Sequence, residues 1–534
     1  MTTFSRALAS VSILLVMVVM AAGCAGAGDG TPAPTPVPSP APVPQPLPTP
    51  TPAPTSVLTV GGSGRYATIQ EAINSARSGD TIQVAQGTYL ENITIKTSKT
   101  FTLQGGWDLK FISRSDNSSL TVIDGKGSGS VIQIQAGLGV AIELTIEGFT
   151  IRNGNAERGG GIHVGCSGTG SHVSLTLNNN AITGNTATAS GGGICASAAQ
   201  KGSTILLNVV NNSIAGNASN NRGGGIFIEC NAGAVVSTLT NNAIRGNTAN
   251  NEGGGIRVNS GGGGSAVVTL TKNIITANAV TQLVKGEGGW DGGGIAAFAS
   301  RSGATALTLT NNVITENEAG WGGGIFGYAW GPDARTTFML NNNIIAKNRA
   351  QYGAGIYCCS GKTCPVSEPG GSVTWTLANN TVTGNTASKD FGGIFFYSGS
   401  TYGDGGSINL SARNDIVWGN RDSRESRQIN LVVQPEKSGV ATAIILHSDV
   451  GSVVTGGAGA YTLDSTINKD PLFVDPANGV FLLKEGSPCI DSGDPGSAYN
   501  DGKRPPAKGT QRNDMGAYGG PNNDDWPEEA TLSR

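Results

Sequence analysis

Residues 212–226 read NSIAGNASNNRGGGI, and residues 242–256 read NAIRGNTANNEGGGI. Each stretch opens with Asn-x-Ile-x-x-Asn and closes with three glycines and an isoleucine. A recurrent pattern at a period of about 30 residues is typical of a solenoid, in which each repeat forms one structural unit that stacks on its neighbours. The pattern therefore predicts a repeat protein.

The same two elements recur along most of the chain. The isoleucine after the glycines recurs at intervals of 32, 32, 30, 39, 30, 31 and 38 residues, at Ile162, Ile194, Ile226, Ile256, Ile295, Ile325, Ile356 and Ile394. The asparagine element lies between these positions, at Asn180/Asn185, Asn212/Asn217, Asn242/Asn247, Asn273/Asn278, Asn312/Asn317, Asn343/Asn348 and Asn380/Asn385, with a last copy at Asp415/Asn420.

Each repeat holds about three short strands and no plausible helix. The run at 173–177, for example, alternates apolar and polar residues, which is the period of a half-buried strand. Strands of this length close into a coil, and coils stack at ~4.8 Å. We expect the aliphatic residues to stack inside, the asparagines to form ladders, and glycine to occupy the sharp corners. The fold class is therefore all-β, a right-handed parallel β-helix of about a dozen coils.

The composition of the chain limits the kinds of partner that it is expected to bind. The chain has 82 glycines in 534 residues, only 13% charged residues, a net charge of −3 and three histidines. Nucleic-acid binding requires concentrated positive charge, so no nucleic-acid partner is expected. Three histidines in the whole chain argue against a His-rich metal site.

The N-terminal region predicts export. Arg6 precedes an apolar run at 7–22, and the segment ends before Cys24, as in a bacterial lipoprotein signal. We expect a signal peptide at 1–23, lipidation of Cys24, and contact with a membrane through that lipid alone. Ordinary cleavage after Ala27 and an uncleaved anchor are the alternatives. The linker at 24–55 is proline-rich, and its polyproline II part would reach ~75 Å.

The β-helix is expected at 56–465 and begins with a capping helix. Thr68 and Glu71 form a capping box, followed by Ala72, Ile73 and Ala76 on one face and Gly79 as the stop. Such a helix would close the otherwise open N-terminal end of the solenoid.

Three segments resemble known families. The stretch ATIQEAINSARSGDTIQVAQGTYLENITI at 67–95 is similar to the N-terminal cap of the pectin-lyase-like β-helix superfamily. The GGGI and NxIxxN coils resemble repeats of polymorphic outer-membrane adhesins. Residues 470–520, within a C-terminal module expected at 466–534, resemble the terminal module of choice-of-anchor exported proteins. The resemblance is specific for fold and weak for activity, because this fold hosts many functions.

Enzymes of the superfamily carry recognisable acid–base sets. The Asn-Thr-Asp, Asp-Asp, His-Gly and Arg-Ile-Lys elements of polygalacturonases are absent, and so is the pectinesterase set. A pectate-lyase-like site needs clustered Asp for Ca²⁺ and an Arg or Lys base, but the repeats hold few carboxylates. If the chain is an enzyme, its acid–base candidates are Arg222, Glu252, Arg257 and Asp291, although carboxylates of adjacent coils are more often solvated surface.

Two columns of side chains are expected to face outward. One lies four residues before the repeat isoleucine, with Phe391 one residue closer, and the other lies one residue after it, because strand side chains alternate. Both columns change from charged to aromatic along the axis, which makes a sugar-binding platform of Trp321, Phe326, Tyr352, Tyr357, Phe391 and Phe395. The alternative is that the aromatic ladder only stabilises the solenoid.

The remaining candidates are weaker. Asp491, Asp494 and Asp501 lie in a Gly- and Pro-rich loop that offers oxygen ligands for Ca²⁺, although turn chemistry explains them as well. No other cofactor is expected. Among the cysteines, Cys364 with Cys358 or Cys359 is the most plausible disulfide.

The sequence thus favours a non-catalytic cell-surface protein, in the cell envelope or outer membrane, that attaches to or recognises a polysaccharide or a host or cell-surface glycan along an extended face. The alternative is a lyase or hydrolase that acts on an acidic polysaccharide. A structural spacer without a ligand is the third interpretation.

Overall fold

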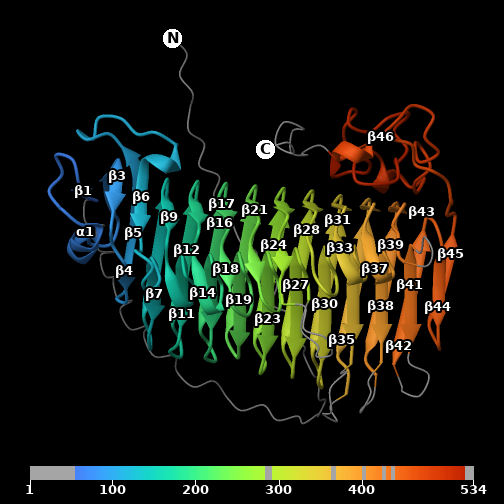
Figure 1. Cartoon of the computed structure of the whole chain (residues 1–534), viewed down its shortest axis with the longest axis horizontal. Helices are drawn as coiled ribbons and strands as arrows, with labels where there is room; N and C mark the ends of the chain where they lie inside the picture. Colours follow the sequence, from blue (N-terminus) through green and yellow to red (C-terminus); the bar gives the residue numbers. More distant parts are fainter. Residues whose placement is uncertain are drawn as a thin grey trace, which may run out of the picture. The chain divides into compact units, whose positions relative to one another are not determined.

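The computed structural model confirms the predicted architecture, a right-handed parallel β-helix (Figure 1). It describes residues 55–282, 291–361, 369–399, 405–423, 428–433 and 439–523. Within these residues, one coil follows another from β1 to β45, and every strand pair of the solenoid is parallel.

Among the described residues, three long sheets form the walls of the solenoid. Sheet A has 14 strands: β1 (Val57–Val60), β2 (Asp80–Ala85), β5 (Lys99–Trp107), β8 (Ala141–Glu147), β12 (His172–Asn178), β16 (Thr204–Val210), β20 (Ala234–Thr240), β24 (Ser265–Thr271), β28 (Ala304–Thr310), β31 (Arg335–Asn341), β35 (Ser372–Ala378), β39 (Ser407–Arg413), β42 (Val440–Leu446) and β45 (Ala460–Asp464). Sheet B has 12 described strands: β3 (Gly87–Tyr89), β6 (Thr121–Asp124), β9 (Thr150–Arg152), β13 (Ala181–Thr183), β17 (Ser213–Ala215), β21 (Ala243–Arg245), β25 (Ile274–Thr276), β29 (Val313–Thr315), β32 (Ile344–Ala346), β36 (Thr381–Thr383), β40 (Ile416–Trp418) and β43 (Asp449–Val450). Sheet C also has 12: β4 (Ile93–Ile95), β7 (Ile132–Ala136), β11 (Ile162–Cys166), β15 (Ile194–Ala198), β19 (Ile226–Asn231), β23 (Ile256–Gly261), β27 (Ile295–Ser300), β30 (Ile325–Trp330), β34 (Ile356–Ser360), β38 (Ile394–Ser398), β41 (Ile429–Val433) and β44 (Val453–Gly456).

A short fourth wall, sheet D, lies between sheets B and C. Its strands are β10 (Asn155–Arg158), β14 (Thr186–Ser190), β18 (Ala218–Ser219), β22 (Thr248–Ala249) and β26 (Ala279–Val280), and single bridges continue it to the pair β33 (Arg349–Tyr352) and β37 (Thr386–Asp390). One coil therefore passes through sheets A, B, D and C in turn, as β12, β13, β14 and β15 do.

The repeat isoleucines face inward as predicted. Each of the eight is at most 1% exposed, and in the register they stand opposite one another from coil to coil. Because stacked aliphatic columns leave water together, the solenoid has one continuous hydrophobic core.

The asparagines form two buried ladders, also as predicted. In the first ladder the Nδ2 of each residue donates to the Oδ1 of the next, at 2.9–3.2 Å from Asn180 to Asp415. The second ladder runs at 2.8–3.0 Å from Asn185 to Asn420 and ends on Gln428. Each rung satisfies buried polar groups of two coils, so the ladders hold the turns in register.

The three glycines that most repeats carry have two different functions. Gly223, the first of its set, has a φ of +63°, which makes the corner between sheets D and C. Gly225, the third, has no room for a side chain, because a Cβ there would lie 2.6 Å from the carbonyl oxygen of Gly255. The glycines thus allow one corner to stack directly on the next.

The acidic end of the first ladder makes stability depend on pH. Burial raises the pKa of Asp415 to about 7, although Asn380 and the amide of Arg413 donate to its carboxylate. A raised folded-state pKa contributes stability at low pH that is lost as the pH rises through about 7. Relative to wild type, Asp415→Asn is therefore expected to gain about 2 kcal/mol of unfolding free energy between pH 5.5 and pH 8. Urea unfolding of both proteins at the two pH values checks this, and a pH-independent difference would contradict it.

The N-terminal cap also exists. Helix α1 (Ile69–Ser75) starts with the Thr68–Glu71 capping box and buries Ile69, Ala72 and Ile73. Its end was predicted wrongly: Ala76 is the C-cap in an extended conformation, and Gly79 (φ +93°) makes the turn before β2 instead.

The C-terminal module lies on the turns of the solenoid. It contains the antiparallel pair β46 (Phe473–Asp475) and β47 (Val480–Leu483) and the 3₁₀ turns Pro476–Asn478 and Ser497–Tyr499; a further 3₁₀ turn, Ser118–Leu120, lies near the N-terminal end. Asn342 and Asn379 donate from the β-helix to backbone carbonyls of the module. In the part of the chain that is described, no helix is long and apolar enough to cross a membrane.

Candidate functional site

The two predicted columns meet at the corner between sheets D and C. The first contains Ser190, Arg222, Glu252, Asp291, Trp321 and Tyr352, which are in direct parallel register. The second follows the repeat isoleucine in sheet C. The positive-φ glycine folds the chain so tightly that a Cβ on Gly253 would lie 2.7 Å from the Cβ of Arg257. The corner therefore packs one column directly against the other.

This packing corrects the predicted exposure of the second column. Phe326 is 2% exposed, and Tyr357 and Phe395 are each 7% exposed. These side chains point away from the core, as expected, but they lie at the base of the corner, in a separate cluster with Phe298 and Cys359. The alternation of a strand gives the direction of a side chain and not its exposure, which depends on the neighbouring wall.

One register assignment was also wrong. Asp390, which stands four residues before Ile394, pairs with Tyr352, and Phe391 takes the corner position that Gly353 has in the preceding coil. Phe391 has a φ of +68° and stacks on Phe395, with ring centroids 4.2 Å apart.

The aromatic half of the corner is an ordered stack. The ring of Tyr357 lies 5.7 Å from that of Trp321 and 5.4 Å from that of Phe326, within 11° of parallel in both cases. Trp321, Tyr352 and Phe391 are half-buried, so each keeps part of its ring at the surface. Buried rings below thus hold partly exposed rings in fixed orientations.

Sequence reasoning missed two partly exposed members of this cluster, Tyr328 and Tyr397. Both are half-buried and stand two residues after the second column, on the same outward side of sheet C. The period-two alternation that placed Phe326 outward places Tyr328 outward as well, so the signal was present. We call the five partly exposed rings, Trp321, Tyr328, Tyr352, Phe391 and Tyr397, the aromatic corner.

The charged half of the corner is an ion network. The Glu252 carboxylate lies 2.8 Å from Nε of Arg257 and 3.1 Å from Nε of Arg222. The Arg257 guanidinium is 3% exposed and lies over the Phe298 ring, 3.4 Å from its centroid. Burial lowers the pKa of Arg257, but an arginine remains charged at any physiological pH.

The carboxylates are buried, contrary to expectation. Glu252 is 9% exposed, and Asp291, in register with it on the next coil, is 5% exposed. A general acid or base must reach the proton that it transfers. Because Glu252 already pairs with two guanidinium groups, the network resembles a structural ion cluster more than an acid–base pair.

The C-terminal aspartates are occupied by turn contacts. Asp491 accepts from Thr510, and Asp494 accepts from the amide of Gly496 and pairs with Arg413. Asp501 accepts from the amides of Asp514 and Gly520, and burial raises its pKa to about 7. Among the described residues, no group of three or more His, Cys, Asp or Glu side chains is arranged to hold a metal ion.

Some predicted positions lie outside the described residues, namely Cys24 and Cys364. The lipid anchor and the disulfide therefore stay predictions. Cys358 and Cys359 are buried thiols, and burial raises the pKa of both well above the usual range.

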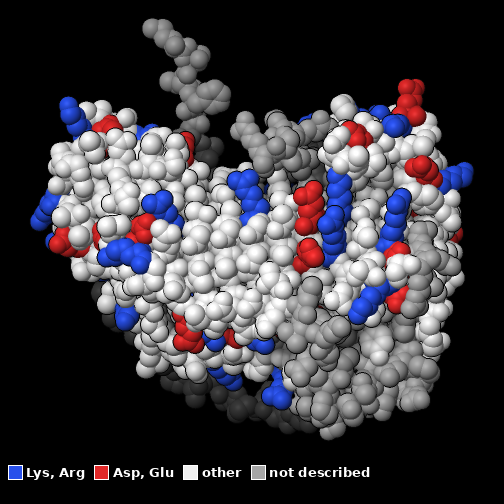
Figure 2. Space-filling view, in the orientation of Figure 1, with Lys and Arg blue, Asp and Glu red and all other residues white. Residues whose placement is uncertain are grey.

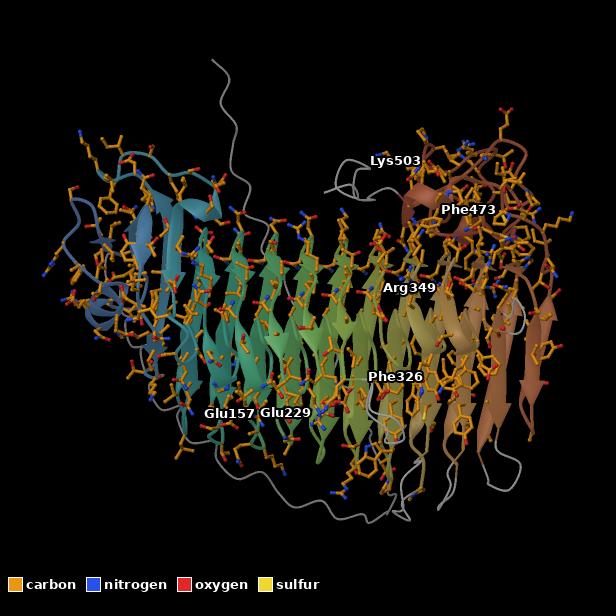
Figure 3. All side chains as sticks on the ribbon, in the orientation of Figure 1. Glu157, Glu229, Phe326, Arg349, Phe473 and Lys503 are labelled. Atoms are coloured by element: carbon orange, nitrogen blue, oxygen red, sulfur yellow. The ribbon has the colours of Figure 1, made fainter. Side chains whose placement is uncertain are left out.

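A second feature was not anticipated. An open groove of about 510 Å³ lies where successive coils enter sheet D, at the first residues of β33 and β37. Ala477 of the C-terminal module also lines it. Two acidic side chains, Glu316 and Glu318, face two basic ones, Lys347 and Arg349, from successive coils. Such neighbouring charged columns stand out from the largely uncharged surface in Figure 2. Figure 3 labels both Arg349 and Phe326; Arg349 begins β33 and Tyr352 of the aromatic corner ends it, so the groove and the corner lie at opposite ends of one strand.

Several chains among the solved structures match this chain. The structure titled "Crystal structure of pectate lyase Pel9A" aligns with a TM-score of 0.39 and 10% sequence identity, over 87% of this chain and 96% of that chain. No protein-family model and no curated protein matches the chain.

Proposed function

We propose that this protein is a non-catalytic surface protein that recognises carbohydrate along the solenoid, with the aromatic corner as its contact surface. The proposal rests on one observation: five partly exposed rings, on three successive coils, are held in place by buried rings beneath them. Aromatic side chains combine a flat apolar surface with polar edges, which suits the faces of sugar rings. Coils repeat at ~4.8 Å, so the surface extends in the direction of a polymer chain.

The predicted export features complete the proposal. A lipid on Cys24 would anchor the chain, and the proline-rich linker at 24–55 would hold the β-helix at a distance from the membrane. At that distance the β-helix could reach a polysaccharide or a cell-surface glycan. The ion network supports recognition over chemistry, since the Glu252 carboxylate is already paired with Arg222 and Arg257.

Single substitutions in the aromatic corner are expected to weaken binding in a graded way. Trp321→Ala and Tyr352→Ala should each reduce affinity for a retained polysaccharide about tenfold, which corresponds to about 1.4 kcal/mol. Tyr461→Ala is the matched control, because Tyr461 is 43% exposed on β45, outside the corner. Affinity electrophoresis of the full chain measures all three, and wild-type affinity in both corner variants would overturn the proposal.

A further inference from the structure

The outer side of sheet A carries a surface that is unrelated to the aromatic corner. Strands β16, β20, β24 and β28 each bury their second, fourth and sixth residues and turn the other four outward. We call these outward residues the threonine face: Thr204, Leu206, Asn208, Val210, Ala234, Val236, Thr238, Thr240, Ser265, Val267, Thr269, Thr271, Ala304, Ala306, Thr308 and Thr310.

No member of the threonine face is charged or aromatic. Charged residues make up 13% of the whole chain, which corresponds to about two of sixteen positions, and none of these sixteen is charged. Leu206, Val236 and Val267 form an aliphatic row, and each is between 40% and 43% exposed. Beside them lies a row of hydroxyls, with Thr238, Thr269 and Thr308 on three successive coils.

The face is also regular in two directions. Its four strands pair in unbroken seven-residue register, without a bulge. Figure 1 shows successive strands of the solenoid stacked side by side with little twist. Equivalent side chains therefore repeat at ~4.8 Å between coils and at ~6.7 Å along each strand.

These properties define the chemistry of a partner. A charged ligand has no counter-charge to meet on this face, and a sugar chain has no aromatic ring to stack on. The surface fits an extended, uncharged and periodic array of hydrogen-bonding groups. The oxygen atoms of the ice lattice repeat at distances close to these two side-chain spacings. Charged side chains hold water in tight hydration shells that do not fit the lattice, and this face has no charged side chain.

From this match we propose that the threonine face binds ice, with the threonine hydroxyls hydrogen-bonding to the lattice and the methyl and aliphatic groups ordering the adjoining water. The proposal is independent of carbohydrate recognition, because the aromatic corner lies between sheets D and C and the threonine face lies on sheet A.

Partitioning of the full chain into a slowly growing ice front tests this proposal. Wild type is expected to be enriched in the ice fraction relative to the remaining liquid. Thr238→Lys places a charge on an exposed position of β20 and should reduce that enrichment at least fivefold, and Thr308→Lys, two coils further, should do the same. Thr188→Lys is the matched control, because Thr188 is exposed on β14 of sheet D. Thermal unfolding of each variant verifies that it is folded.

Three outcomes would overturn the proposal. The first is exclusion of wild type from the ice. The second is wild-type partitioning of both face variants. The third is a dimer in sedimentation velocity that Thr238→Lys dissociates without any enrichment in ice, which would make the face an interface between two copies of the chain.

Discussion

Replacing Asn317 by alanine is expected to lower the free energy of unfolding by about 4 kcal/mol, because several buried groups would each lose a partner worth about 1–3 kcal/mol. Asn317 is fully buried in the middle of the second ladder. Its Oδ1 accepts from the amide and the Nδ2 of Asn278, both at 3.0 Å. Its Nδ2 donates to the carbonyl of Ile275 and to Oδ1 of Asn348.

Asn208→Ala is the matched control for this change. Asn208 lies on β16 with its side chain exposed, so the same substitution is expected to change stability by less than about 0.5 kcal/mol. Urea unfolding followed by circular dichroism compares the two variants. Equal, small effects would show that the ladder does not hold the coils together.

Replacing Glu252 by alanine is expected to destabilise the protein by about 3–5 kcal/mol, because the change leaves a buried charge without its partner. Arg257, which is 3% exposed in the wild-type structure, would stay beneath the corner with its closest carboxylate removed. Urea unfolding detects this loss of stability. If recognition is non-catalytic, as proposed, an assay for the release of polysaccharide chain ends is expected to detect no product from either wild type or Glu252→Ala.

Glu229→Ala provides the comparison for Glu252. Glu229 pairs with Arg158 at 2.6 Å, but the Arg158 side chain is 38% exposed and can turn to water. Its loss is expected to change stability by no more than about 1 kcal/mol. If Glu252→Ala left stability intact and removed an enzymatic activity, the ion network would be an active site instead of a structural cluster.

The features that repeat along the chain were predictable from the sequence. The GGGI element placed every repeat isoleucine in the core, and the Asn-x-Ile-x-x-Asn element gave both ladders. Each signal is local, since one residue type occupies one position in every coil. The capping helix was predictable for the same reason, because Thr68 and Glu71 form a self-contained box.

The environment of the candidate site was less predictable. The sequence identified both columns, but it did not reveal that they meet at a corner or that the wall of sheet D covers Phe326 and Arg257. How deeply these side chains are buried depends on the angle between sheets D and C. The positive-φ glycines set that angle, and the repeat period of the sequence carries no information about it. Phe391 stands three residues before Ile394, and the structure gives it the positive-φ corner position that a glycine takes in the neighbouring coils instead of a place in the first column.

The most direct test of the central claim follows binding and chemistry in one sample. The full chain is incubated with a panel of acidic and neutral polysaccharides, with and without Ca²⁺, and both its retention and the release of unsaturated or reducing ends are measured over time. Non-catalytic recognition predicts retention on at least one polysaccharide with no product above the protein-free background. Accumulation of new chain ends in proportion to protein concentration would contradict it and identify the protein as a polysaccharide-degrading enzyme.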